Sequence, residues 1–463
     1  MMARILRIEL RRSPAAFIAL LSIVLGTGLL LSYTVGFEGR WMQLAVAVRM
    51  NLLLMLPLAL AGGAWLGRRD TLYRVDELFA STVRPRRQRV VPAAAALALA
   101  MVSAYLLVFL IGVPWVAPTS GYFPVAAIAV TVVGAISLIA AGWLGMAAGR
   151  AVPRLFTAPA LAVVGAAVAG IIPLWMGEPM VGGDAKPGPA ALLLSPIHDG
   201  NIDDFQTIVA RVNTTQALWL TALAITALLL VGAASRRTVA LAVLPAVVGA
   251  VIAVPLLPAG GYSAAAAVDP VARELVCDSD GPRVCVTRVH AYLLPEVVGP
   301  ARQALTMLAA KLPDAPTRVV ESPQLHDWAR SSTDPAPVPH QPDTLGFGLA
   351  SIGIVSSEFA DPIFLTFLLG SAWEQDCDAK MSGEPGGTEG RYLFQEVAAA
   401  WLRGQPSTWQ ALMPEERGQA EDAYRTLTGL PPAEQGRRMA QARAAALNCQ
   451  GEDLMPFLYG ETP

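Results

Sequence analysis

"GRRDTLYRVDELFASTVRPRRQR" (residues 67–89) concentrates seven arginines in a chain of which 54% of the residues are hydrophobic. Apolar runs flank it on both sides, "NLLLMLPLALAGGAWLG" (51–67) and "VVPAAAALALAMVSAYLLVFLIGV" (90–113). Both runs approach or exceed the length needed to cross a bilayer, because about 20 apolar residues span ~30 Å of hydrocarbon. The arginine-rich stretch is therefore interpreted as a cytoplasmic loop between two membrane spans, and not as a nucleic-acid-binding arm.

The composition divides the chain into two parts with different environments. Charged residues make up only 15% of the chain, and the mean hydropathy is +0.48. Residues 1–256 carry 19 Lys and Arg against 10 Asp and Glu, a balance of +9, whereas residues 257–463 carry 15 against 26, a balance of −11. An apolar, basic part followed by a polar, acidic part predicts a multi-pass α-helical membrane region and a separate domain outside the lipid.

Seven apolar segments predict the spans of the membrane region. They cover residues 15–34, 46–67, 91–113, 124–149, 155–176, 216–235 and 238–257. Small residues are frequent in them, as expected where helices pack closely within a bilayer. Gly26, Gly28, Gly62 and Gly63 are interpreted as such packing positions.

The distribution of basic residues predicts the orientation. With a cytoplasmic N-terminus, 15 of the 19 basic residues in residues 1–256 fall on the cytoplasmic side, as the positive-inside rule requires. Only Arg40, Arg49, Lys186 and Arg211 remain on the other side. Seven crossings then place residues 258–463 outside the plasma (cytoplasmic) membrane.

The N-terminal residues 1–14, "MMARILRIELRRSP", have an amphipathic pattern. They predict an interfacial helix that lies along the cytoplasmic membrane face and is retained rather than cleaved as a signal peptide.

All four cysteines lie in the part expected outside the membrane. An even number of cysteines in an oxidising compartment predicts two disulfides. Three pairings are possible, and the favoured one joins Cys277 to Cys285 and Cys377 to Cys449. No metal site is expected, because the chain lacks a Cys-x-x-Cys motif and its histidines are widely scattered.

Two stretches carry a resemblance to a known family. "ILRIELRR" (5–12) and "GRRDTLYRVDELFASTVRPRRQRV" (67–90) resemble the amphipathic start and the polar coupling segment of ABC type-2 exporter permeases. The resemblance covers about residues 1–237 and implies a six-span permease core over residues 15–237. It also implies that residues 68–90 form a cytoplasmic coupling loop, which docks into a separate ATP-hydrolysing subunit.

The resemblance assigns roles to individual residues of the coupling loop. It implies that Arg74, Asp76, Glu77, Leu78 and Phe79 lie on or near the coupling helix, with Leu78 and Phe79 as the apolar anchor. The flanking arginines would contact the partner or anionic lipid headgroups. The alternative is that these arginines only fix the topology.

The resemblance also implies the partners. These are two copies of an ABC ATPase subunit, and either a second copy of this permease or a sister permease. The chain has no Gly-Lys-Ser/Thr phosphate-binding loop, so ATP and Mg²⁺ are expected on the partner ATPase, and the chain itself is expected to be neither an enzyme nor a cofactor protein. Membrane lipid is an expected partner, and nucleic acid is not.

Two further regions of the membrane part attract functional predictions. Residues 177–214, between the fifth and sixth spans, are expected to form an external loop with gate helices, including a short helix at 201–212. Arg49 and Asn51 interrupt the second span and are candidates for the translocation pathway, because charge within a membrane is costly and often functional. The alternative for Arg49 is that its side chain reaches the outer surface. The seventh span, 238–257, is an addition to the six-span core.

The extracytoplasmic domain, residues 258–463, begins with a linker, "LLPAGGYSAAAAVDP" (256–270), and is predicted to be α+β. Strand patterns occur in residues 283–293, 317–322 and 345–355. Helical patterns occur at residues 294–312, 358–375, 390–403, 414–429 and 432–447.

The stretch "RYLFQEVAAAWLRGQP" (391–406) distantly resembles helices of gluzincin metallopeptidases. In one register, Gln395, Glu396 and Ala399 occupy the frame of a His-Glu-x-x-His motif without its histidines. In the other, Glu396 takes the place of the third zinc ligand. Peptide hydrolysis is not expected, because two imidazoles are missing from the ligand set. The alternative is an ordinary amphipathic helix with Trp401 in the core. His290, His326 and His340 are expected on the surface or in the core.

The leading hypothesis is the permease subunit of an ATP-driven exporter. It would move a hydrophobic or amphipathic cargo, such as a drug, a peptide or a lipid, by alternating access. The alternative is a membrane-anchored extracellular sensor or interaction protein. A membrane-bound zinc peptidase is disfavoured by the missing ligands.

Overall fold

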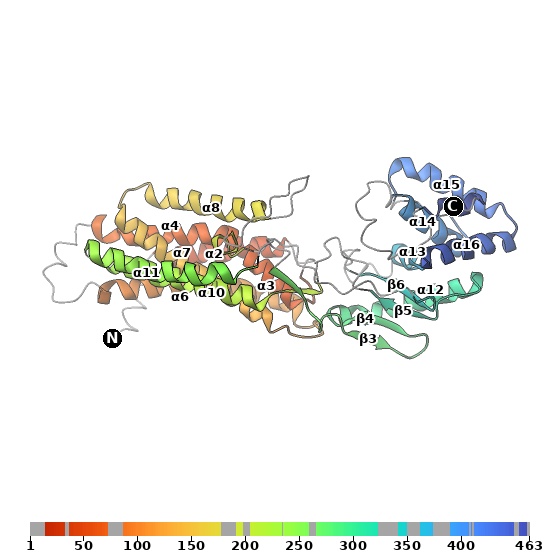
Figure 1. The fold of residues 1–463 in the computed structure, drawn as a ribbon, viewed down its shortest axis with the longest axis horizontal. Coiled ribbons are helices and arrows are strands. Elements are labelled where there is room, and N and C mark those ends of the chain that lie inside the picture. The colour runs from red at the N-terminus through yellow and green to blue at the C-terminus, as the bar shows by residue number, and fades with distance from the viewer. Residues whose placement is uncertain are drawn as a thin grey trace. The chain divides into compact units, whose positions relative to one another are not determined.

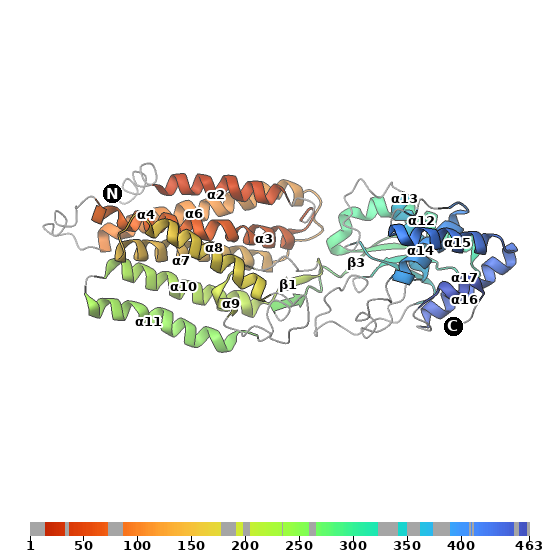
Figure 2. The same ribbon diagram turned by 90° about the horizontal axis from the view of Figure 1, so that it is seen from above.

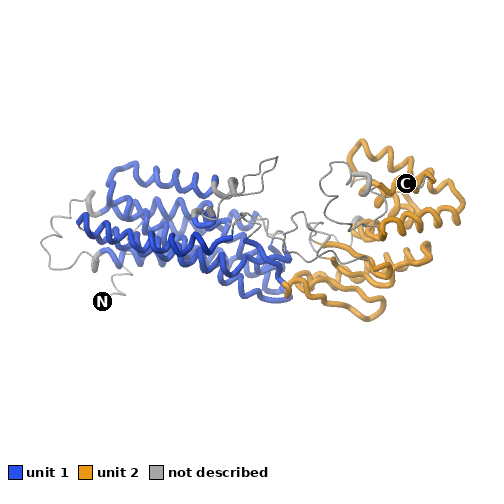
Figure 3. The backbone as a smooth tube through the Cα atoms, viewed as in Figure 1, with its two compact units in different colours: residues 1–269 blue, residues 270–463 orange. Residues whose placement is uncertain are grey.

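The computed structural model describes most of the chain in two compact units (Figures 1 and 3). The units are Met1–Asp269 and Pro270–Pro463. The described residues are 14–32, 37–72, 87–176, 191–197, 204–233, 235–258, 265–322, 341–349, 362–373, 389–406, 409, 412–448 and 453–460.

Unit 1 is a bundle of long apolar helices that lie side by side (Figure 2). They are α2 (Pro14–Leu31), α3 (Trp41–Met50), α4 (Leu52–Leu72), α6 (Arg87–Val116), α7 (Ala126–Ala151), α8 (Thr157–Met176), the short α9 (Ala191–Leu194), α10 (Ala210–Gly232) and α11 (Arg236–Ala253), which continues into a 3-10 turn, Val254–Leu256. A helix lies at each of the seven predicted spans.

Five of these helices are long and apolar enough to cross a membrane, and the bent pair α3–α4 makes a sixth candidate. The described apolar part of α8 is shorter, Thr157–Ile171. The structure therefore has the architecture of a multi-pass helical membrane protein, with five or six candidate spans among the described residues rather than the expected seven.

Short connections at residues 117–125, 152–156 and 233–235 make consecutive long helices antiparallel. One end of the bundle, which we call the basic end, therefore holds the end of α4, the start of α6, the α7–α8 turn and the start of α11 (Figure 2). Its described basic residues are Arg68, Arg69, Arg150, Arg154, Arg236 and Arg237.

Glycines allow α4 and α7 to touch backbone to backbone. A Cβ atom on Gly63, Gly67, Gly145 or Gly149 would come closer than 3.0 Å to main-chain atoms of the facing helix. Two glycines spaced four apart on each helix form the small-residue stripe that lets membrane helices approach closely. The two helices thus form a closely packed pair in the bundle.

The other predicted packing glycines differ among themselves. A Cβ on Gly62 would collide with Ile18, and one on Gly26 would lie 2.7 Å from Cε of Met55. A Cβ on Gly28 would meet nothing within 4 Å among the described residues, so the packing role expected for Gly28 is wrong within this chain. Its place on the exposed face of α2 is the reason.

A two-stranded ribbon joins the start of α10 to the residues that follow α11. Strand β1 (Gln206–Ile208) pairs with β2 (Ala266–Val268) in antiparallel register, with Gln206 opposite Val268. The helix expected at 201–212 is therefore wrong over residues 204–209, where β1 precedes α10, and only its last residues, 210–212, are helical. Likewise, 266–268 form a strand rather than an irregular linker. Only the returning chain supplies the partner strand, so the local pattern could not indicate the ribbon.

Unit 2 is α+β. Its sheet has the order β3 (Leu275–Asp278), β4 (Val284–Thr287), β5 (Arg318–Glu321), β6 (Thr344–Phe347), with β3–β4 antiparallel and the other two pairs parallel. The helices are α12 (Leu294–Lys311), α13 (Pro362–Gly370), α14 (Glu389–Arg403), α15 (Pro414–Thr428), α16 (Pro432–Leu447) and α17 (Met455–Tyr459). One hydrophobic core joins the sheet to the helices.

The sheet of unit 2 contains one of the two expected disulfides. Cys277 and Cys285 face each other across the β3–β4 hairpin and are bonded. Cys377 and Cys449 lie outside the described residues. The strand expected over 283–293 ends at Thr287, and a 3-10 helix, Arg288–Leu293, follows.

Candidate functional site

The bend between α3 and α4 is the most distinctive feature of the bundle. The two helices meet at Asn51 at an angle of 43°. The main-chain N–H of Asn51 donates to the carbonyl of Ala47 (3.3 Å), and the main-chain carbonyl of Asn51 accepts from the N–H of Met55 (3.0 Å). The side-chain amide donates to the carbonyl of Gly26 on α2 (3.1 Å). Asn51 therefore satisfies the backbone at the break and ties it to α2.

Arg49, two residues before the break, is the centre of a buried polar network. Its side chain is 0% exposed. Nε donates to the carbonyl of Pro196, Nη1 to Oδ1 of Asn213 (3.1 Å) and Nη2 to Oε1 of Gln216 (2.5 Å). A buried guanidinium is tolerable only when its donors are paired. The expectation that Arg49 reaches the outer surface is wrong, because its acceptors lie inside the bundle.

The network holds the segment that precedes α10. Gln216 donates from Nε2 to the carbonyl of Leu192 (2.8 Å), and Trp219 donates from Nε1 to that of Leu193 (2.9 Å). Residues 192, 193 and 195–197 are buried. This part of the predicted external loop therefore folds back against the bundle, while 177–190 and 198–203 lie outside the described residues. We call Arg49, Asn51, Asn213 and Gln216, together with residues 191–197, the hub.

Several buried polar atoms of the bundle have no hydrogen-bond partner among the described residues. Among them are Oγ of Ser22, Oγ1 of Thr27, the hydroxyl of Tyr105 and Nδ2 of Asn213. The Asn213 amide belongs to the hub itself, so the hub retains one spare donor. Spare buried donors are commonly met by water or by a ligand.

At the same end of the bundle, two polar contacts fix the ribbon. Asp204, just before β1, forms an ion pair with Arg40 and accepts from Nε2 of Gln43 (3.2 Å). Asp269, just after β2, accepts from the hydroxyl of Tyr122 (2.8 Å). Burial, and then this hydrogen bond, raise the pKa of Tyr122, so it stays a neutral donor. The hub and the ribbon thus share the helices α3 and α10.

Replacing Arg49 with lysine tests the hub. A lysine keeps the charge but is a compact point donor that lacks the planar fork of guanidinium. We expect Arg49→Lys to lower the stability of the bundle by about 2 kcal/mol, since more than one charge-assisted bond is lost. Hydrogen exchange should increase in 191–197 and at the start of α10. Arg211→Lys, on the exposed face of α10, is the matched control, and equal exchange in both variants would contradict the role of Arg49.

The predicted coupling residues Arg74, Asp76, Glu77, Leu78 and Phe79 lie outside the described residues. The flanking helices end at Leu72 and begin at Arg87, both at the basic end.

Unit 2 contains a buried ionisable pair that sequence reasoning missed. Oε1 of Glu321 lies 2.5 Å from Nδ1 of His290, and Oε2 accepts from the amide (2.7 Å) and the hydroxyl (2.8 Å) of Thr287. Burial alone would raise the pKa of Glu321, but the His290 ring and the two Thr287 donors outweigh it and lower the pKa. Both side chains are almost fully buried. Because Glu321 ends β5 and bonds to Thr287, which ends β4, and to His290, these contacts join the carboxyl ends of the two strands. The pair's only sequence signal is a glutamate closing an apolar strand, "RVVE".

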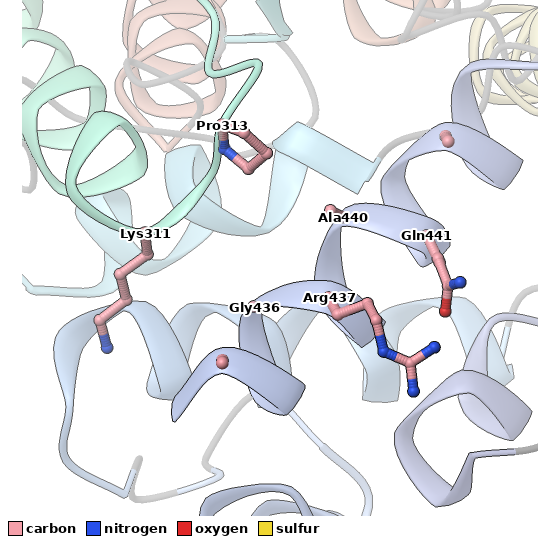
Figure 4. Close-up of a pocket in the computed structure, with 8 residues that line it drawn as sticks. Lys311, Pro313, Gly436, Arg437, Ala440 and Gln441 are labelled. Carbon is pink, nitrogen blue, oxygen red and sulfur yellow. The ribbon is translucent and has the colours of Figure 1, made fainter. Parts of the chain in front are cut away.

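A shallow groove of about 490 Å³ runs between the end of α12 and α16 (Figure 4). Its two basic residues are already engaged. Lys311 Nζ donates to the carbonyl of Trp401 and lies 4.9 Å from the ring centroid, while Arg437 makes two bonds to Glu434. The remaining lining is formed by Pro313, Ala433, Gly436, Ala440, Gln441 and Ala444.

Helix α14, which contains most of the stretch 391–406, is part of the core of unit 2. Trp401 of α14 is buried, and its Nε1 donates to Oε1 of Gln435 (2.8 Å), as the alternative of an ordinary amphipathic helix requires. Ala399, which stands where a zinc-binding histidine would be, is buried too. Within the described parts of the chain, no three His, Cys, Asp or Glu residues gather as metal ligands.

Comparisons of the chain with protein-family models, with curated proteins and with solved structures found no match.

Proposed function

We propose that this chain is the membrane-embedded permease subunit of an ATP-driven ABC exporter. The observation that supports this most is the hub, in which residues 191–197 fold back against the bundle and are held by Arg49 beside a bent helix. An exporter needs such an element on the side away from its motor, where it can close the exit of a translocation path. The cargo class that suits the apolar bundle is hydrophobic or amphipathic.

The proposed mechanism is alternating access in a dimer of permeases. A partner ATPase binds ATP and Mg²⁺ and moves the basic end of α4 through residues 68–90. The glycine contacts between α4 and α7 make these two helices move as one rigid body, because a closely packed interface shifts as a unit. The bend at Asn51 is where that movement meets α3 and the hub. This chain performs no covalent chemistry.

We propose that the basic end faces the cytoplasm and that unit 2 lies outside the plasma membrane. The clustering of arginines at one end of the bundle and the disulfide in unit 2 support this orientation. A cysteine placed at Arg211 should react with a membrane-impermeant maleimide in intact cells, and one placed at Arg154 only after lysis. The reverse pattern would refute the orientation.

Copurification of the ATPase tests the exporter proposal. The protein is purified in mild detergent, and its partners are identified by mass spectrometry. Phe79→Asp should abolish recovery of a Walker-type ATPase, since a charge cannot occupy an apolar docking cleft. Phe17→Asn, at an exposed position of α2 within the bundle, is the control that retains the partner. Absence of any ATPase from the wild-type protein would contradict the proposal.

The second candidate is a membrane-anchored sensor, which the independent core of unit 2 favours. A sensor would recover a cytoplasmic output protein instead, and Phe79→Asp would leave its ligand binding at unit 2 unchanged.

A further inference from the structure

The turn between α7 and α8 exposes apolar side chains at the basic end. Leu155 is 78% exposed and Phe156 is 58% exposed. The turn is nevertheless well fixed, because the amide of Arg154 and the hydroxyl of Thr157 both donate to the carbonyl of Val152 (2.8 and 2.7 Å). Two large apolar groups are therefore presented outward on a firm support.

Arg68 of α4 is hydrogen-bonded to this turn from the inner side of the bundle. Its side chain is only 3% exposed, and Nη1 donates to the carbonyl of Arg154 (3.3 Å). The Arg68 guanidinium lies 4.3 Å from the centroid of the Trp65 ring, and Trp65 is 53% exposed. The Arg154 guanidinium lies 5.8 Å from the centroid of the Phe156 ring. Two arginines, each beside an exposed aromatic ring, thus meet at one corner of the bundle.

No described carboxylate balances these two charges. The Asp and Glu side chains that the structure describes in unit 1 are Glu38, Asp204 and Asp269. All three lie at the opposite end, beside the start of α3, the start of β1 and the end of β2. Neither Arg68 nor Arg154 has an ion pair with a described residue. The corner is therefore positive, aromatic and apolar at once.

We propose that this corner binds the phosphate of an anionic phospholipid headgroup. The phosphate accepts hydrogen bonds from the exposed Arg154, while the buried Arg68 adds positive charge and holds the carbonyl of Arg154 in place. Leu155 and Phe156 enter the upper part of the acyl chains, and Trp65 lies at the interface, where tryptophan is favoured. Basic sites between spans on the cytoplasmic side are suited to anionic headgroups. The inference rests on the membrane embedding in the proposed function, but not on exporter activity.

Lipid retention tests the site. The full-length protein is purified from membranes, placed in nanodiscs of equal phosphatidylglycerol and phosphatidylcholine, and re-extracted, and its bound lipids are counted by native mass spectrometry. Arg154→Gln should lower bound phosphatidylglycerol about fivefold, as expected for one basic residue near the surface. Phosphatidylcholine should not change. Arg211→Gln, an exposed arginine at the other end, is the control and should retain the wild-type level.

Two outcomes would overturn the proposal. One is wild-type retention of phosphatidylglycerol in Arg154→Gln. The other is an equal loss in Arg154→Gln and Arg211→Gln, which would mean that the lipid is attracted only by overall charge. If Arg154→Gln kept its lipid but lost a copurifying protein, the corner would be a protein contact instead. Failure to find an ATPase leaves the lipid count unaffected, so the two proposals fail separately.

Discussion

Gly145→Ala is expected to lower the free energy of unfolding of the bundle by about 3 kcal/mol, the upper range for overpacking a tight interface. The added Cβ would overlap the carbonyl group of Leu60 on α4. A main-chain carbonyl cannot rotate away as a side chain can, so α4 and α7 must separate. Their separation also opens the neighbouring contacts of Gly63, Gly67 and Gly149.

Gly28→Ala is the matched control on α2. It adds the same methyl group at a position with nothing within 4 Å, and alanine gains up to about 1 kcal/mol of helix propensity over glycine. The two substitutions should therefore shift the thermal unfolding midpoint of the purified protein in opposite directions or by clearly different amounts. The midpoint is measured by size-exclusion chromatography after heating. Equal midpoints would show that α4 and α7 are not in backbone contact.

Glu321→Gln is expected to cost unit 2 about 3–5 kcal/mol, the range for breaking a buried pair by removing one partner. The amide nitrogen of glutamine would replace one carboxylate oxygen and offer a donor where His290 and Thr287 require acceptors. Hydrogen exchange of β4 and β5 in the full-length protein measures the effect. Glu421→Gln, in an exposed pair with Arg425, should leave exchange nearly unchanged.

The same pair predicts a pH dependence. The pKa of Glu321 is lowered in the folded protein, so the stability contributed by its carboxylate is present above the unfolded pKa of about 4.3 and is lost as the pH falls through the folded pKa. The difference between wild type and Glu321→Gln should therefore be full at neutral pH and shrink below about pH 4. A difference that stayed constant through this range would argue against an ionised Glu321.

Much of the secondary structure could be predicted from the sequence because it depends on local patterns. Each predicted apolar segment carries a helix, and the helices expected at 390–403, 414–429 and 432–447 are found at Glu389–Arg403, Pro414–Thr428 and Pro432–Leu447. Hydropathy and helical period are properties of neighbouring residues, so no distant contact was needed. The α+β class of unit 2 and the Cys277–Cys285 disulfide were also expected, whereas strand β3, Leu275–Asp278, was not.

The candidate site could be predicted only in part. Arg49 and Asn51 were recognisable because polar residues are costly in an apolar helix. Asn213, Gln216 and residues 191–197 were not, because a polar residue near the end of a span usually faces water. The coupling residues around Phe79 remain predictions from resemblance.

Composition and helical period along the chain were enough to predict the apolar helices and the places where arginine is concentrated. They did not locate the boundary between the two units, which was expected before residue 258 and lies between Asp269 and Pro270. Three features became visible only in the folded chain: the side chain of Arg49 is buried, β1 pairs with β2, and His290 contacts Glu321. The partners of Arg49 lie 147–167 residues away along the chain, and a side chain's direction depends on acceptors that exist only after distant helices have packed.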